Sequence, residues 1–158
     1  SGTINLIKLN LPTSKSINIS LDRDINNKFI AKKKITQLFK KLSFSEGIIK
    51  KSLYSSAIKN NVDPNIIIEF ARLYGFEIDF QRDIRKGDNF QIMYEVFEDD
   101  EGKIFETGNV IFADLILRNQ KNSLYYFNKR NSKGHYDKNG KKVKKALMKT
   151  PINGARLS

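Results

Sequence analysis

The chain has 158 residues, which is enough for one or two small domains with a buried core. It contains no apolar run of membrane-spanning length and no secretory leader with a cleavage site. The absence of cysteine excludes a disulfide scaffold, a thiolate zinc site and a cysteine nucleophile.

The net charge of +12 is distributed unevenly. Residues 1–62 carry +9, residues 63–107 carry −7 and residues 108–158 carry +10. Such a field favours an anionic partner, namely nucleic acid, a membrane surface or a wall polymer. The joint richness in Lys, Asn and Ile has an alternative explanation, because an AT-rich genome produces it without selection for binding.

The first part of the chain is predicted to form short strands at 4–9 and 17–21, with a turn at 11–14 between them. Residues 28–42 are ambiguous, because their apolar side chains fit both the spacing of a strand and the stripe of a helix. Periodicity alone leaves both alternatives open there.

Two helices are predicted next, at 45–60 and 63–74. Ser45 can cap the first helix, in which an apolar residue recurs at every fourth position. Asp63 can cap the second, and Pro64 suits its first turn because the missing N–H has no helical partner there.

Beyond residue 75 the apolar period falls to about two, which predicts an antiparallel sheet. Phe90 and the three alternate residues after it point one way. The expected strands and turns are a strand over 90–96, a hairpin loop at 98–102, strands at 104–107 and 110–118, a turn at 119–122, a strand at 124–127 and a hairpin turn at 137–140.

Several residues are candidate ligands or catalysts by residue type. His135 is better explained as an exposed or partly packed turn residue than as a metal ligand. Asp137 and Asn139 resemble a calcium loop only faintly and are better explained by a β-turn. The acids at 98–101 fit a solvated loop. Candidate carboxylates for glycoside hydrolysis exist at Asp79, Asp83 and Asp88, but nothing fixes their geometry, and Asp88 is expected to bind backbone amides.

Two features of the sequence are compatible with nucleic-acid binding. The helix pair suggests a helix-turn-helix, but the second helix is apolar and lies in the acidic third of the chain. Tyr125, Tyr126 and Phe127, with Lys129 and Arg130 beside them, could stack bases, although such aromatics more often pack in a sheet. The basic tail over 133–149 is expected to be a solvated linker rather than a binding surface.

The order of short motifs from Gly47 to Ser158 resembles the segment that precedes the catalytic domain in lysostaphin-like zinc metalloendopeptidases. The matching pieces are Ser52-Leu53-Tyr54 with Ala57, Phe76-Glu77-Ile78-Asp79-Phe80, Arg85-Lys86-Gly87-Asp88 with Phe90, Ile111 with Ala113, Tyr125-Tyr126-Phe127, Tyr136-Asp137 with Gly140, and Thr150-Pro151 followed by Arg156-Leu157-Ser158. Their common order and spacing over about a hundred residues argue against a chance match. The resemblance favours a strand at 28–42.

The resemblance implies a parent enzyme that cuts peptide crosslinks of peptidoglycan in the bacterial periplasm or cell envelope, with any export signal upstream. The family's zinc motifs, His-x-x-x-Asp and His-x-His, are absent from this sequence, whose single histidine cannot supply the roughly three protein ligands of a catalytic zinc. No catalytic, cofactor-binding or metal-binding residue is therefore assigned, and zinc is expected in the absent downstream domain.

The predicted fold is α+β, an antiparallel bent sheet or partial barrel with a packed αα-hairpin. Residues 1–44 are strands of the same sheet or the end of a preceding domain, 45–149 form a non-catalytic α+β domain, and 150–158 link it to the peptidase. The expected role is regulatory or scaffolding: the region orients or gates its own peptidase domain, and peptidoglycan or an anionic envelope surface is a further candidate partner. The alternative is a stand-alone basic module for nucleic acid or an anionic polymer; nucleic acid is the less favoured partner.

Overall fold

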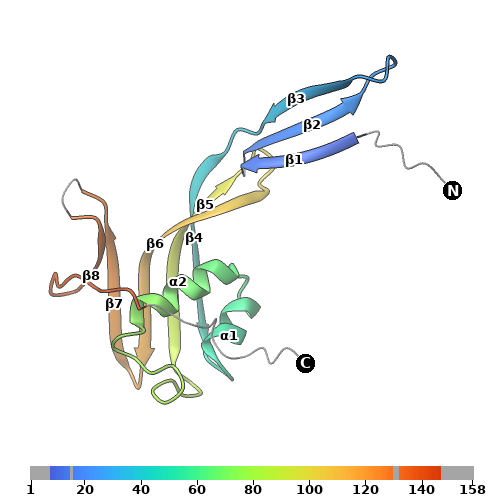
Figure 1. The fold of residues 1–158 in the computed structure, drawn as a ribbon. Coiled ribbons are helices and arrows are strands. Elements are labelled where there is room, and N and C mark those ends of the chain that lie inside the picture. Colours follow the sequence, from blue (N-terminus) through green and yellow to red (C-terminus); the bar gives the residue numbers. More distant parts are fainter. Residues whose placement is uncertain (1–7, 15, 130–131, 147–158) are drawn as a thin grey trace. The chain divides into compact units, whose positions relative to one another are not determined.

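The computed structural model describes residues 8–14, 16–129 and 132–146 (Figure 1). In this part, the elements in chain order are β1 (Lys8–Ser14), β2 (Ile17–Arg23), β3 (Phe29–Ile35), β4 (Phe39–Ile48), α1 (Leu53–Lys59), α2 (Pro64–Tyr74), β5 (Asn89–Glu98), β6 (Ile104–Leu117), β7 (Gln120–Phe127) and β8 (Gly134–Asp137). They form a three-stranded sheet in the order β1-β2-β3 and a five-stranded sheet in the order β4-β5-β6-β7-β8.

The predicted α+β class with antiparallel strands is thus confirmed, and the five-stranded sheet is open rather than a closed barrel. A mutually packed pair of helices stays a prediction. Both described helices are far too short to cross a membrane.

The chain divides into two compact units. Unit 1 comprises residues 1–41 and 97–106, and unit 2 comprises residues 42–96 and 107–158. All the buried residues of the described chain lie in unit 2. The predicted domain division at residue 45 stays a prediction, and the predicted linker at 150–158 lies outside the described residues.

Unit 1 contains a meander of three paired strands. Residues 28–42 contain β3 and the start of β4, so the strand alternative is confirmed. The turn predicted at 11–14 is wrong: Leu11 pairs with Ile19, and β1 continues to Ser14 after a shift of register at Pro12. An edge strand tolerates this proline because its missing N–H removes no bond from a second neighbour.

Unit 2 contains both helices, and the start predicted for the first one is wrong. Ser45 lies in β4, and the helix begins at Leu53, where the Ser52 hydroxyl accepts from the Ser55 amide at 3.1 Å. Gly47, near the end of β4, has no room for a side chain, because a Cβ there would lie 2.7 Å from Nδ2 of Asn60 and 3.0 Å from Cε1 of Phe90. The second helix begins as predicted, after its Asp63 cap.

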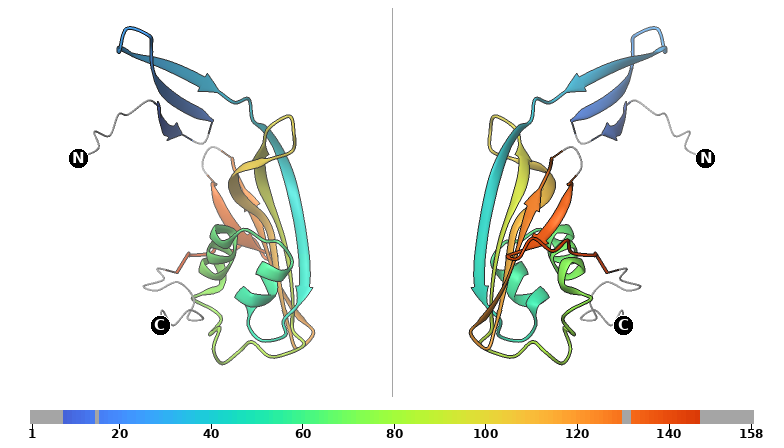
Figure 2. Two further views of the ribbon diagram at one scale, coloured as in Figure 1. Left: turned by 90° about the vertical axis from the view of Figure 1, so that its right-hand side faces the viewer. Right: turned by 90° about the vertical axis from the view of Figure 1, so that its left-hand side faces the viewer.

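The core of unit 2 joins the helices to the sheet. Figures 1 and 2 show α1 and α2 on one face of the five-stranded sheet, and no helix of the described residues covers the opposite face. The buried cluster includes Leu53, Ala57, Ile66, Ile67, Phe70, Leu73 and Tyr74 from the helices and Phe90, Ile92, Tyr94, Val96, Val110, Ala113, Leu115 and Leu124 from the strands. The alternating burial predicted for 90–96 is confirmed.

Three turns have the same hydrogen-bond pattern, in which the first aspartate of the turn accepts from backbone amides of that turn. Asp24, Asp99 and Asp137 each accept two backbone amides through Oδ1, from the residues two and four positions later, at 2.8–3.1 Å. The third residue after each aspartate has positive φ, and it is Asn27, Gly102 and Gly140 respectively. The predicted turns at 98–102 and 137–140 are confirmed. By contrast, 104–117 is one strand, and the turn predicted at 119–122 is centred on Arg118 and Asn119.

Candidate functional site

His135 is buried in β8, with 3% of its surface exposed, so the expectation of an exposed or partly packed turn histidine is wrong. Its Nε2 lies 2.7 Å from the carbonyl oxygen of Val110, and its ring lies 5.0 Å from that of Tyr126. Burial lowers the pKa of His135 because the imidazolium loses its hydration. The described residues contain no cluster of three or more histidine and acidic side chains that could hold a metal ion.

The candidate carboxylates do not form a catalytic pair. Asp88 is buried and accepts from the backbone amides of Arg85 at 2.7 Å and Arg118 at 3.0 Å, as the sequence predicted in part. Asp79 and Asp83 accept from amides of their own loop, at 2.9 Å from Gln81 and 2.8 Å from Asp79 respectively. The side chains of Asp99 and Asp137 are committed to turns as described above, and Glu98 forms an ion pair with Lys41.

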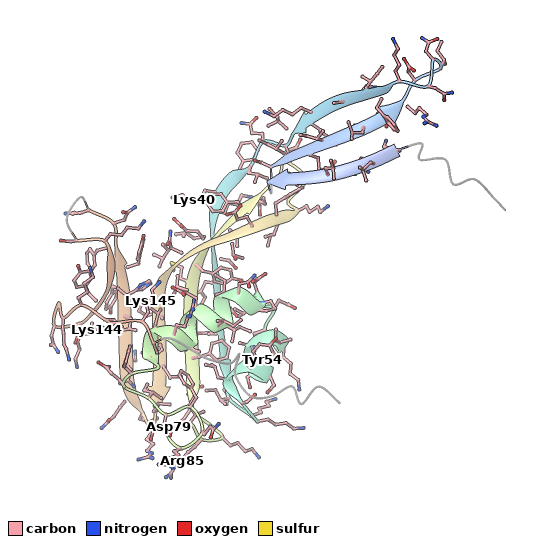
Figure 3. The ribbon with its side chains drawn as sticks, in the orientation of Figure 1. Lys40, Tyr54, Asp79, Arg85, Lys144 and Lys145 are labelled. Carbon is pink, nitrogen blue, oxygen red and sulfur yellow. The ribbon has the colours of Figure 1, made fainter. Side chains whose placement is uncertain are left out.

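The basic tail is only partly as expected. Within the described residues, 134–137 form β8, and the segment after it is attached to α2 rather than being a solvated linker. The amide of Ala146 donates to the carbonyl of Arg72 at 2.9 Å, and Lys145 forms an ion pair with Glu69. Figure 3 shows Lys145 beside this helix. Residues 147–149 lie outside the described part.

The helices do not form a DNA-reading pair. The first helix is short, and Ile66, Ile67 and Phe70 of the second helix are buried in the core. A recognition helix must leave polar side chains open to a groove, so the rejection of this motif from the sequence is consistent with the packing.

The aromatic motif on β7 is divided between the two faces of the sheet. Tyr125 pairs with Phe112 of β6 and with Tyr136 of β8, and directly paired residues share a face. Phe127, two residues along, shares that face. Tyr126 points to the other face, against His135. Three consecutive aromatics therefore do not form one stacking surface, which agrees with the sequence analysis in favouring sheet packing for them.

A different aromatic set takes its place on the face without helices. We call Phe112, Tyr125, Phe127 and Tyr136 the aromatic face. The ring centroids of Phe112 and Tyr125 are 5.4 Å apart, and those of Phe127 and Tyr136 are 5.6 Å apart in an edge-to-face arrangement. Tyr125 and Phe127 are 42% and 49% exposed, so each presents a large part of its ring to solvent.

Lysines and a shallow hollow border the aromatic face. Phe127, Lys129, Ser132, Tyr136 and Gly140 line a hollow of about 260 Å³. Lys142 is bridged to Tyr136, and its side chain extends across Gly134: a Cβ on that glycine would lie 2.8 Å from Cε of the lysine. Glycine at this position therefore leaves the space that the lysine occupies.

One acid lies next to the aromatic face and was missed by the sequence analysis. Asp114 pairs with Ser123, two residues along from the Phe112 and Tyr125 pair, and is 2% exposed; no described residue forms a hydrogen bond with its Oδ1. Burial raises the pKa of Asp114, while the Ser123 hydroxyl and the Lys121 ammonium lower it. The only signal in the sequence is a single acid inside the apolar run of 110–117.

Comparisons with known proteins begin with the fold. No known family model matches the sequence. The structure of Helicobacter pylori Csd3 resembles this chain with a TM-score of 0.60 at 19% identity, over 87% of this chain and 36% of that one. A zinc-containing peptidase from Vibrio cholerae gives a TM-score of 0.61 at 17% identity, over 86% of this chain and 40% of that one. The fold is thus one found within larger proteins, of which at least one is a zinc-containing peptidase.

The sequence comparison identifies a particular relative. The chain is 33% identical over 117 residues to the peptidoglycan DD-endopeptidase ShyC of Vibrio cholerae. The match covers 74% of this chain and 26% of that protein, so the chain spans about a quarter of its relative's length. The predicted resemblance is confirmed: the chain is homologous to a region of a peptidoglycan endopeptidase.

Proposed function

We propose that this chain is the non-catalytic regulatory or scaffolding region of a zinc metalloendopeptidase that hydrolyses peptidoglycan crosslinks in the bacterial cell envelope, in the periplasm. The observation that carries the proposal is the 33% identity to a peptidoglycan endopeptidase over a region without a metal-binding cluster in its described residues. The one histidine is buried against a carbonyl, so these residues do not fit a catalytic zinc. The zinc belongs, in this proposal, to a separate peptidase domain.

In the proposed role the region orients or gates that peptidase domain. Support comes from the anchored segment after β8, in which the amide of Val143 donates to the carbonyl of His135 at 2.8 Å and that of Ala146 to Arg72. A chain fixed to the folded unit at two points leaves fewer orientations to whatever follows it. The physical effect is a restricted set of positions for the attached domain.

The test uses the full-length parent enzyme and a version that lacks residues 45–145. Release of soluble fragments from purified peptidoglycan sacculi is measured for both. The expected result is a changed rate or a changed response to activation, because the peptidase domain loses its positioning partner. An unchanged rate of release would contradict the proposal.

A point variant tests the attachment without a deletion. Glu69→Gln removes the charge that pairs with Lys145, and Glu101→Gln is a control on an exposed acid of the turn between β5 and β6, for which no ion pair with the segment is present among the described residues. Cleavage by the parent enzyme is expected to change with the first substitution and not with the second.

A further inference from the structure

The aromatic face lies on the side of the unit 2 sheet that no helix covers. Two of its four rings are nearly half exposed, although large apolar side chains are usually buried. The rings come from three neighbouring strands and adjoin one another, so they form a continuous patch. Contiguous exposed apolar patches with a polar rim mark binding surfaces.

From this arrangement we propose that the aromatic face binds the glycan strand of peptidoglycan. The inference rests on the proposed function for the nature of the polymer and goes beyond it by naming the surface. A sugar ring has an apolar side of C–H groups that carry slight positive charge, and an aromatic ring has a negative face. Flat stacking of sugars on Tyr125 and Phe127 uses this complementarity.

The hollow beside Phe127 and Tyr136 suits one unit of such a strand. Its volume of about 260 Å³ is below the usual size of a pocket for a drug-sized molecule, and it is open on the surface. The Ser132 side chain offers a hydroxyl and Lys129 an ammonium group, which can bond to the hydroxyl and acetamido groups of an amino sugar.

The charges at the rim match the rest of the polymer. Peptide stems attached to the glycan carry free carboxylates, and Lys121, Lys129 and Lys142 lie at the border of the aromatic face. A nucleic acid would place phosphates along the whole surface, yet an acid, Asp114, pairs with Ser123 two residues along from the Phe112 and Tyr125 pair. The positive charges that could attract an anion thus lie only at the border of the aromatic face. This arrangement favours a largely neutral glycan with anionic side groups over a polyanion.

The first experiment measures co-sedimentation of the 158-residue chain with purified sacculi, and binding to soluble glycan strands from which the peptide stems have been removed. Tyr125→Ala and Phe127→Ala are each expected to weaken binding to both by about tenfold. Tyr54→Ala is the matched control, because Tyr54 is also exposed but lies on α1, on the face of the sheet that the helices cover (Figure 3). Circular dichroism and thermal unfolding verify that each variant is folded.

A second measurement tests the same surface without removing an aromatic side chain. The chain has no tryptophan, so Tyr125→Trp introduces a single fluorescent reporter on the aromatic face. Addition of stem-free glycan is expected to shift its emission to shorter wavelength, whereas the same reporter at Tyr54→Trp does not respond.

The outcomes separate this inference from the proposed function. Equal binding by the wild type and both alanine variants, binding to stem peptides alone, tighter binding to RNA than to glycan, or no binding at all would overturn the inference. Deletion of residues 45–145 can still alter cleavage in each of those cases, and the proposed function then stands. Conversely, glycan binding that persists while the deletion leaves cleavage unchanged supports the surface and contradicts the regulatory role.

Discussion

The two units of this chain are built from similar strands but are stabilised in different ways. In unit 2, both helices and three strands of the five-stranded sheet contribute to one buried cluster. Unit 1 contains no buried residue among those that the structure describes. Its apolar side chains stay accessible to solvent; Leu11 is 42% exposed and Ile35 is 65% exposed. Unit 1 is therefore stabilised mainly by strand pairing, and unit 2 by removal of apolar surface from water.

The register shows why unit 1 gains so little from its apolar residues. Its alternating side chains do share a face, since Leu9 pairs with Leu21 and Leu21 with Ala31. The pattern of a half-buried sheet is present, but no second layer of unit 1 covers that face in the described residues. Amphipathic alternation thus specifies which face is apolar, and burial follows only where another element packs against it.

The largest expected effect comes from truncation of one aromatic residue in each unit. Phe70→Ala removes a ring that is 2% exposed and is expected to lower the free energy of unfolding by about 3–5 kcal/mol. Phe29→Ala removes a ring that is 47% exposed and contacts the Arg23 guanidinium at 5.2 Å, so a loss below about 1 kcal/mol is expected. Urea unfolding followed by circular dichroism measures both, and equal losses would contradict the comparison.

A carboxylate that accepts two amides provides a second matched pair. Asp88→Ala leaves the amides of Arg85 and Arg118 without their partner in a buried position, with an expected loss of about 2–3 kcal/mol. Asp24→Ala removes the same kind of contact from an exposed turn of unit 1, where water replaces it, and the expected loss is below about 1 kcal/mol. The same unfolding assay compares the two variants. A larger loss of stability for Asp24→Ala than for Asp88→Ala would contradict the view that burial makes the Asp88 contacts the stronger ones.

The pH dependence should be confined to unit 2, which contains the single histidine. The unfolded His135 titrates near 6.5, and burial places the folded pKa lower. At a pH between the folded and the unfolded pKa of His135, the unfolded chain binds a proton that the folded chain does not. The contribution of His135 to the free energy of unfolding is therefore fully present above pH 6.5 and decreases as the pH falls. Hydrogen exchange between about pH 7.5 and about pH 5.5 should show this loss in unit 2 amides. His135→Gln is expected to reduce the loss, and an unchanged pH profile in this variant would contradict it.

The smallest effect is expected at the aspartate turns, which are the same in both units. Asn27 has a φ of 62° in the position where Gly140 has 78°. Asn27→Gly is expected to stabilise the β2–β3 hairpin by about 0.5–1 kcal/mol, and Gly140→Asn to destabilise the turn after β8 by a similar amount. Hydrogen exchange at the flanking amides measures both changes, and effects of the same sign would show that the two turns differ.

Local patterns made several parts of this structure predictable. The second helix was predicted because its cap and its first proline act within one turn, and the alternation in 90–96 was predicted because strand period depends on neighbouring residues only. The sequence predicts the first helix too early because Ser45 is a good cap in isolation, whereas Ser45 lies in β4, which pairs with β5, a strand distant in sequence.

The candidate site was predictable to a smaller extent. Tyr125 and Phe127 were recognised as aromatic residues with basic neighbours, but Tyr126 was grouped with them because a sequence motif does not show which face each side chain takes. Phe112 and Asp114 lie beside these aromatic residues because β6 pairs with β7, and the sequence does not show this pairing. His135 was expected near the surface because a nearby turn suggests exposure, and its burial results from packing beside Val110 and Tyr126.

The sequence by itself determined the α+β class, the hairpin turns at 98–102 and 137–140, and the homology to a peptidoglycan endopeptidase, because these follow from local propensity and from the order of motifs. The tertiary structure alone decided that unit 2 holds the buried residues, that the segment after β8 is attached to α2, and that aromatic side chains from three strands adjoin on the face that no helix covers. These features depend on contacts between residues far apart in the chain, which no local pattern encodes.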